Sequence, residues 1–121
     1  LSMAGRNTDQ VAYINLHGTA TRSNDAAEGL AVATLFGKSV PCSSTKGHTG
    51  HALGAAGIVE VTLSALAMEN GMIPGGINTH EVDQTIHINY QLKNVAASPK
   101  VVMSNSFGFG GSNCSLLLEC P

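Results

Sequence analysis

The sequence predicts a single α/β domain, and three observations support this. Apolar, strand-like runs alternate with helical segments in the order strand, helix, strand, helix, and further strands follow. Glycine occurs at the expected junctions between elements. Three of the expected strands also end in residues of unusual chemistry. Because ligands of α/β sheets bind beyond the carboxyl ends of the strands, we expect a site at that edge of the sheet.

The first strand and helix are predicted from residues 11–37. Residues 11–16, VAYINL, form an apolar run that is typical of a buried strand. Asp25, with Glu28 three residues later, has the spacing of a helix N-cap and its capping box, so a helix is expected over residues 26–36. Gly37 follows at the position where the end of a helix needs a left-handed backbone.

The middle of the chain predicts a short strand and a long helix. Residues 40–44 are compatible with a strand, and residues 51–69 are expected to form a helix that Asn70 and Gly71 close. Residues 72–85, which contain Pro-Gly-Gly, are interpreted as a loop.

The last third of the chain predicts three strands. They cover residues 86–90, 100–106 and 112–119. The glycine-rich turn 108–111 separates the last two. The sequence shows no internal repeat and no low-complexity segment.

The helix expected over residues 51–69 is apolar nearly all round, which is typical of a helix buried on every side. Gly54 and Gly57 would let another backbone approach it closely. A domain of this size rarely surrounds such a helix alone, so we infer a missing partner: more chain, a second subunit or both. Glu60 is the exception in this helix, and its carboxylate needs a cation or must become neutral.

Composition excludes several function classes. The net charge of −2 does not favour nucleic-acid binding, and no run of about 18 apolar residues suggests a membrane span. The chain contains an odd number of cysteines without framework spacing, which fits a reducing cytoplasm better than a secreted disulfide scaffold. They are Cys42, Cys114 and Cys120.

His17 follows the first strand, Lys46 and His51 follow the second, and Phe107 follows a third. His17 is either a hydrogen-bonded core histidine or a site residue. His51 is either a simple capping residue or a neutral hydrogen-bond donor, because a helix start lowers a histidine pKa. Lys46 is either solvated or bound to a carboxylate, and Glu60 is its preferred partner.

Three alternative sites are weak. Cys42, followed by two serines, resembles a nucleophile but lies within a strand pattern, not at a helix start where a thiol would be activated. Cys42, His48 and His51 match no standard zinc spacing. The turn 108–111 lacks the spacing and the following helix of a dinucleotide-binding loop.

Three motifs occur in order: HGTAT, STKGHTGHALGAAG and SNSFGFGGSN. In these motifs nearly the whole chain resembles the C-terminal half of β-ketoacyl-acyl-carrier-protein synthases. It is most similar to the elongating synthases of fatty-acid synthesis and to their polyketide and aryl-polyene relatives. The resemblance implies a thiolase-like fold of two similar α/β halves. Residues 1–121 would be the second half, a mixed β-sheet packed against helices in layers.

The resemblance also implies an acyltransferase that performs a decarboxylative Claisen condensation of malonyl-acyl-carrier protein with an acyl thioester. His17 and His51 would donate to the malonyl thioester oxygen and stabilise the enolate. Lys46 would hold the network of histidines and acid in place, and Glu60 would pair with that network.

Other matching residues would contact the substrate. Thr19 and Thr21 match hydroxyl residues that touch the pantetheine arm. Phe107 matches a gating phenylalanine whose backbone N–H would help an oxyanion hole at the acylated cysteine. The loop that follows would approach the substrate and move through its glycines, Gly108, Gly110 and Gly111.

The family nucleophile is a cysteine of the N-terminal half, which this sequence does not contain, so we expect the chain alone to be inactive. The implied partners are acyl carrier protein, the N-terminal half and a second copy of the full-length enzyme. No metal or bound cofactor is implied, because the phosphopantetheine of the carrier protein holds the substrates. The alternative is a non-catalytic subunit that resembles a chain-length factor. Retention of His17, Lys46 and His51 together favours the enzyme.

Overall fold

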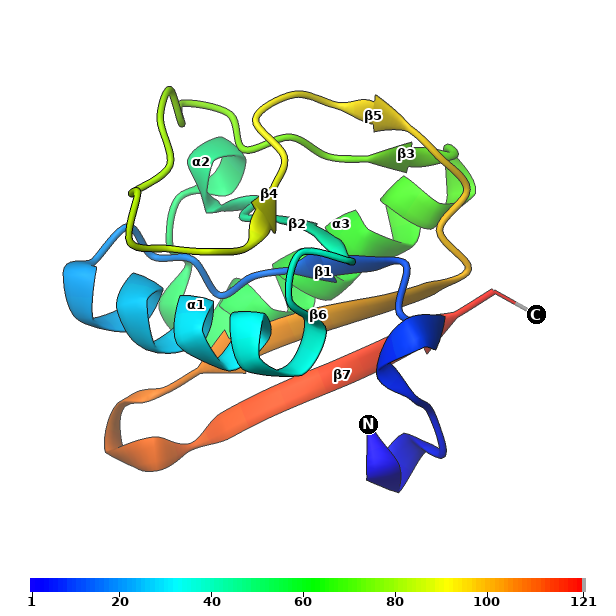
Figure 1. Ribbon diagram of the computed structural model, residues 1–121, viewed down its shortest axis with the longest axis horizontal. Helices are drawn as coiled ribbons and strands as arrows, with labels where there is room; N and C mark the ends of the chain where they lie inside the picture. Colours follow the sequence, from blue (N-terminus) through cyan, green and yellow to red (C-terminus); the bar gives the residue numbers. More distant parts are fainter. Residues whose placement is uncertain (121) are drawn as a thin grey trace.

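The computed structural model describes residues 1–120, which form a five-stranded mixed sheet between helices (Figure 1). The strands lie in the order β4, β2, β1, β6, β7. Their bounds are β1 (Tyr13–Asn15), β2 (Pro41–Ser43), β4 (Asn89–Tyr90), β6 (Val101–Phe107) and β7 (Asn113–Glu119). The predicted class, a mixed β-sheet packed against helices in a layered α/β arrangement, is confirmed.

Helices cover both faces of this sheet. Figure 1 shows α1 (Arg22–Phe36) in front of the sheet and α3 (Ala56–Glu69) behind it. The short helix α2 (Lys46–Thr49) follows β2 directly. Strands β4, β2, β1 and β6 run parallel to one another, and β7 runs antiparallel to β6.

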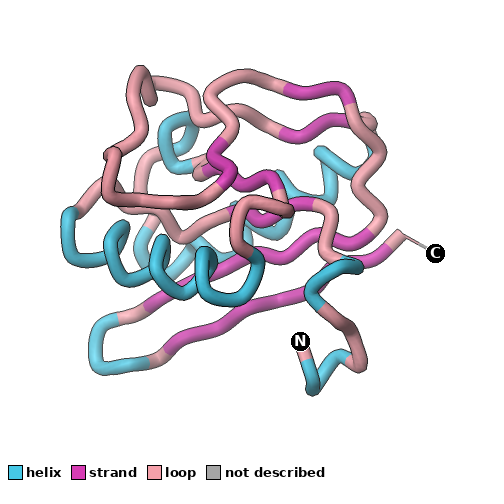
Figure 2. The backbone as a smooth tube through the Cα atoms, in the orientation of Figure 1, coloured by secondary structure: helices cyan, strands magenta, loops and turns pink. Residues whose placement is uncertain are grey.

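A second, two-stranded sheet lies apart from the first (Figure 2). It pairs β3 (Met72–Ile73) with β5 (Val95–Ala96) in antiparallel orientation. β3 lies in the segment 72–85 that the sequence predicts as loop, so that prediction is wrong at its first two residues. Strands of two residues are too short to show the alternation that identifies a strand. Only the last two residues of the predicted strand 86–90 are β-structure, namely Asn89 and Tyr90.

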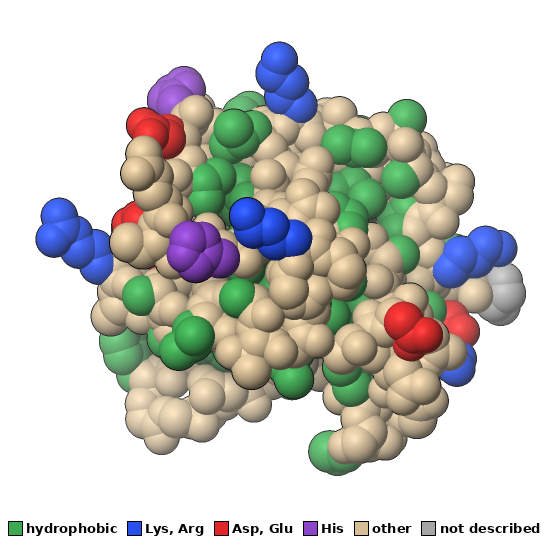
Figure 3. All heavy atoms as spheres, in the orientation of Figure 1, with side chains coloured by type: hydrophobic (Ala, Val, Ile, Leu, Met, Phe, Trp, Pro, Cys, Tyr) green, Lys and Arg blue, Asp and Glu red, His purple; other side chains and the backbone are tan. Residues whose placement is uncertain are grey.

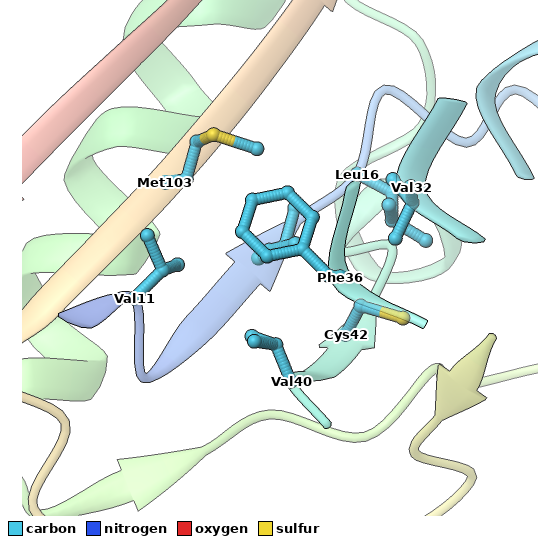
Figure 4. Packing of buried hydrophobic residues seen from close by; sticks show 8 residues of the cluster. Val11, Leu16, Val32, Phe36, Val40, Cys42 and Met103 are labelled. Atoms are coloured by element: carbon cyan, nitrogen blue, oxygen red, sulfur yellow. The ribbon is translucent and has the colours of Figure 1, made fainter. Parts of the chain in front are cut away.

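Alternate residues of β1 face opposite layers, because successive side chains of a strand point to opposite faces of the sheet. Ile14 packs in the cluster that contains Val32 and Phe36 of α1, whereas Tyr13 packs in a second cluster that Met68 of α3 contacts. Figure 4 shows the Phe36 ring at the centre of the first cluster. Both faces of β1 are therefore buried, as its apolar run predicts.

α1 begins at Arg22, four residues before the predicted start, so the predicted capping box is wrong. Thr21 is the N-cap residue, and Asp25 lies within the first turn. Glu28 is only 3% exposed. Its carboxylate faces the interior because buried N–H groups donate to it there. Gly37 ends the helix with a φ of 58°, as its predicted role requires, although its ψ of −127° differs from that of a left-handed helix.

The predicted helix over residues 51–69 is wrong in its first turn. Leu53–Ala55 is a separate 3₁₀ turn, and α3 starts only after it. Leu53 has a φ of 50°, and Gly50 has a φ of 72°. A right-handed helix cannot continue through such residues. His51 therefore lies in the connection between α2 and α3, and the expectation that a helix dipole acts on it is also wrong.

The apolar α3 is covered on one side only. Glu60, Ser64 and Ala67 are buried, whereas Ile58 is 66% exposed and Leu66 is 46% exposed. The expected burial on every side is thus absent from the described chain, because the sheet packs against one face of the helix. The partner that would cover the other face stays a prediction. No helix within residues 1–120 combines the length and apolarity needed to cross a membrane.

The loop after β3 packs closely on its surroundings, and this closeness requires glycine. At Gly75 an added Cβ would lie 2.6 Å from the Cα atom of Lys93. At Gly47 it would clash with the backbone carbonyl oxygen of Ile77. Figure 2 shows this loop on the same side of the molecule as α2. The loop therefore helps to fix the turn that carries Lys46.

Substitution of Gly75 with alanine is expected to lower the free energy of unfolding by about 1–3 kcal/mol, since the neighbouring Lys93 backbone must shift. The matched control is Gly54→Ala, where no atom lies within 4 Å of the added Cβ. That variant should be neutral or more stable by up to about 1 kcal/mol. Urea denaturation measures both, and equal effects would contradict the close packing.

Candidate active site

The carboxyl ends of β1, β2 and β6 meet at one edge of the sheet, because β1 lies between the other two and all three are parallel. This arrangement brings together residues from the three strand ends. The ring centroid of His17 lies 5.5 Å from that of His51 and 5.6 Å from that of Phe107. The sequence suggested that residues after these strands lie close together, and the structure places His17, His51 and Phe107 side by side. The order of the strands explains this proximity.

Lys46 forms a buried ion pair with Glu60, the partner that the sequence favours. Their side chains are only 6% and 2% exposed. Glu60 uses Oε1 for Lys46, and its Oε2 accepts a hydrogen bond of 3.2 Å from the hydroxyl of Ser106. Ser106 was missed in the sequence because a serine within a strand carries no distinguishing pattern. The lysine charge is thus held inside the protein at a defined place.

The neutral form of His17 carries its proton on Nε2. Its Nδ1 atom lies 3.3 Å from Nζ of Lys46. An ammonium group only donates, so Nδ1 must accept and the ring proton is on the other nitrogen. His51 has the same tautomer, because its Nδ1 accepts a hydrogen bond of 3.3 Å from the backbone N–H of Leu53. Both imidazoles therefore offer an Nε2–H donor.

The pKa of His17 is lowered to about 4. Burial is the main cause because it disfavours the charged imidazolium, and the positive charge of Lys46 acts in the same direction. His51 contributes further, whereas Asp25 has a smaller opposite effect. His17 is therefore a neutral hydrogen-bond donor at neutral pH.

Glu28 holds the backbone of this site and was missed as a site residue. Its carboxylate accepts hydrogen bonds of 2.9 Å from the backbone N–H groups of His17 and Gly18, and one of 3.1 Å from Asn105. Burial raises the pKa of Glu28, and these hydrogen bonds oppose that rise. The sequence did contain a signal that Glu28 is buried. Val32 lies four residues after Glu28, so an apolar residue shares its face of the helix.

Thr19 lines a cavity of about 530 Å³ beside this edge of the sheet, together with Lys46 and His51. The exposed Thr21 lies next to it, with the two hydroxyl oxygens 2.9 Å apart. The sequence pattern assigned neither threonine to a strand or a helix. In the structure both lie on the connection between β1 and α1.

The glycine-rich turn after β6 is exposed and lies outside the lining of this cavity. Gly110 and Gly111 have φ values of 81° and 87°, which other residues rarely adopt. Gly108 precedes them, and the side chain of Phe109 is fully exposed. The structure therefore brings Phe107 to the histidines, and the role of the three glycines that follow it stays a prediction.

Cys42 is not an activated thiol. It lies in β2 with 0% exposure, and burial raises its pKa to about 12. His48 lies on the exposed surface of α2. Across residues 1–120, histidine, cysteine and acidic side chains form no group of three or more that could hold a metal ion.

Comparisons with known proteins bear on the family of this chain. Residues 1–80 match the family model described as Beta-ketoacyl synthase, C-terminal domain. The chain is 42% identical over 121 residues to 3-oxoacyl-(acyl-carrier-protein) synthase 1 of Escherichia coli (strain K12). This match covers 98% of this chain and 30% of that protein.

Two solved structures share the fold. One is a ketosynthase in complex with its chain length factor from Xenorhabdus doucetiae, with a TM-score of 0.93 and 40% identity over 100% of this chain and 31% of that one. The other is a type II PKS acyl-carrier protein in complex with its ketosynthase, with a TM-score of 0.93 and 28% identity over 100% of this chain and 31% of that one.

The chain thus spans about 30% of the length of the curated relative described above. The resemblance predicted from three short motifs, and the thiolase-like fold that it implies, are confirmed by the family model and by the solved ketosynthases. The chain belongs to the β-ketoacyl synthase family and corresponds to its C-terminal domain.

Proposed function

We propose that this chain supplies the decarboxylating part of the active site of a β-ketoacyl-acyl-carrier-protein synthase. The enzyme would be an acyltransferase that condenses malonyl-acyl-carrier protein with an enzyme-bound acyl thioester. One observation carries the proposal: two adjacent imidazoles, His17 and His51, each present an Nε2–H donor. A pair of neutral donors fits a reaction in which negative charge develops on one oxygen atom.

In the proposed reaction, His17 and His51 donate to the thioester carbonyl oxygen of the malonyl group. When the carbon–carbon bond to the carboxylate breaks, carbon dioxide leaves and the electron pair stays on the adjacent carbon. The charge is shared with the carbonyl oxygen as an enolate, which binds the two donors more strongly than the neutral carbonyl does. The enolate carbon then attacks the acyl thioester, and the cysteine thiolate leaves.

Lys46 and Glu60 would act through His17. The Lys46 ammonium group faces Nδ1 of His17, which keeps the proton on Nε2 and disfavours a second proton. Glu60 pairs with this ammonium and Ser106 donates to Glu60, so the charge stays in position. A neutral and oriented His17 is the result.

The acyl group would be carried by a cysteine of the N-terminal half of the enzyme. Within the described residues the buried Cys42 is unsuitable, because its thiol does not ionise at neutral pH. Phe107 would act as a gate beside that cysteine, with its backbone N–H in an oxyanion hole. Thr19 and Thr21 would contact the pantetheine arm. Movement of the loop would rest on Gly108, Gly110 and Gly111.

Acyl carrier protein is the proposed partner, and its phosphopantetheine would deliver both substrates without a cofactor held by this chain. The relatives support this, since one is named as an acyl-carrier-protein synthase and another was solved with an acyl-carrier protein.

The face in Figure 3 carries scattered basic side chains and no basic patch. We further propose a dimer of the full-length enzyme in the cytoplasm.

A non-catalytic subunit of the chain-length-factor type is the competing proposal. Such a subunit has no chemical need for two oriented imidazoles backed by a buried lysine. The retained contacts among His17, Lys46 and Glu60 therefore favour the enzyme.

Substitution of His17 or His51 with alanine in the full-length gene product is expected to lower kcat for decarboxylation of malonyl-acyl-carrier protein by about 10²–10³-fold, because each change removes one donor to the enolate oxygen. The matched control is His48→Ala, three positions from His51 but exposed on α2. Release of labelled carbon dioxide measures the rates. An equal loss in the control would contradict the assignment.

The stability of the protein is expected to depend on pH through His17. Its pKa is about 4 in the folded protein and about 6.5 when unfolded, so the unfolded chain binds more protons between these values. The free energy of unfolding should therefore fall as the pH is lowered from about 6.5 towards 4. Urea denaturation of wild type and His17→Gln measures this, and the variant should show a smaller slope. Titration of His17 near 6.5 would exclude the mechanism.

The isolated chain of residues 1–121 is expected to show no condensation, whereas the full-length gene product condenses malonyl and acyl substrates. The physical reason is that burial keeps the thiol of Cys42 protonated, so this thiol cannot take up an acyl group. Cys42→Ala in the full-length product should retain the activity. Product analysis by mass spectrometry measures all three proteins, and condensation by the isolated chain would refute the two-part site.

A further inference from the structure

Asn15 is a fully buried amide in the middle of the sheet, and the proposed reaction assigns it no role. It is the last residue of β1 and has 0% exposure. It lies two positions after Tyr13, so its side chain points to the same face of the sheet, which α3 covers. His17 follows two positions later in the chain. A buried polar group of this kind needs partners for all its donors and acceptors, and the partners that it has are informative.

The amide contacts the backbone of the helix at Glu60 itself. Nδ2 of Asn15 lies 3.2 Å from the carbonyl oxygen of Glu60 and 3.3 Å from the hydroxyl of Ser64, one turn later in α3. Both acceptors lie on the buried side of α3. Asn15 therefore joins the central strand to the helix at the residue that carries the carboxylate of the ion pair.

The same amide contacts the residue before Lys46. The hydroxyl of Thr45 lies 3.3 Å from Oδ1 of Asn15 and 3.2 Å from its Nδ2. One consistent assignment satisfies every group: Thr45 donates to Oδ1, and the two Nδ2 hydrogens go to Glu60 and Ser64. Thr45 is the N-cap residue of α2, so its position sets where Lys46 begins the helix.

We propose that Asn15 is the positioning residue that holds His17, Lys46 and Glu60 in register with one another. These three side chains come from β1, α2 and α3, and one buried amide contacts or adjoins each of them. α2 has only four residues and cannot hold Lys46 by its own stability. The kinetic part of this inference rests on the proposed function, whereas its structural part does not.

The chemistry of the amide suits this role better than other side chains. It combines an acceptor for the Thr45 hydroxyl with two donors for the acceptors on α3. Asn15→Asp would place an acceptor against the Glu60 carbonyl oxygen, and Asn15→Ala would leave all these groups without their buried partner. In either variant α2 and α3 can shift relative to β1.

The test compares Asn15→Ala and Asn15→Asp with Tyr13→Phe in the full-length gene product. Tyr13 is matched to Asn15, because it has 0% exposure, lies on the same face of β1 and makes a buried hydrogen bond of 2.7 Å to Ser43. Its partner is not a member of the ion pair. Urea denaturation of each variant establishes that it folds and how much stability it has lost.

Two readouts go beyond stability. In Asn15→Ala, kcat for malonyl decarboxylation should fall by about 10–100-fold with KM changed less than about threefold, since a small misplacement affects the reacting geometry. The pKa of His17, measured by NMR on histidine-labelled protein, should rise, because the Lys46 charge moves away and water enters. Tyr13→Phe should leave kcat and this pKa near their wild-type values.

The outcomes are distinct. If both Asn15 variants lose stability as Tyr13→Phe does, yet keep the wild-type kcat and His17 pKa, Asn15 is only a core residue and the inference is wrong. If wild type itself decarboxylates nothing, the proposed function fails, but the difference in His17 pKa between the variants still tests the position of Lys46. If Asn15→Ala does not fold, the conservative Asn15→Asp decides by the same two readouts.

Discussion

The buried ion pair between Lys46 and Glu60 is the interaction on which the rest of the site depends. Both charges are almost fully removed from water, and the cost of this is offset only by close pairing and further hydrogen bonds. Loss of one partner of such a pair costs about 3–5 kcal/mol. The turn after β2 and the helix α3 are therefore tied to each other. Burial is the main reason that the pKa of His17 is lowered, and the same ion pair adds a positive charge beside this imidazole that acts in the same direction.

The end of β1 is held from both faces of the sheet, and this follows from its central position. On the α1 face, Glu28 accepts hydrogen bonds from the backbone N–H groups of His17 and Gly18. On the α3 face, the amide of Asn15 contacts Glu60. Buried polar networks of this kind are costly when a partner is missing and rigid when all partners are present. Rigidity is what two hydrogen-bond donors need if they are to stabilise a developing charge.

The two imidazole donors are oriented by contacts within this chain, whereas its buried Cys42 does not offer an activated thiol. Every contact that sets the tautomers of His17 and His51 comes from residues 1–120. Cys42 is buried and protonated, and one side of α3 exposes Ile58 and Leu66. A chain that covers about 30% of its curated relative can thus carry a formed half-site. This arrangement is consistent with the proposed division of the reaction, in which this chain serves the decarboxylation and another part of the protein carries the acyl group.

The sequence by itself determined the five strands of the main sheet, the two long helices and the reactive groups that follow the strands. The apolar run before His17 and the turn at residues 108–111 predict strands correctly, because periodicity and turn residues act over a few neighbours. Only the tertiary structure decided where His51 lies, because a positive φ at Leu53 interrupts the helix. It also decided the role of Glu28, whose partner Asn105 is 77 residues away. Such contacts depend on strand order, which local sequence patterns do not contain.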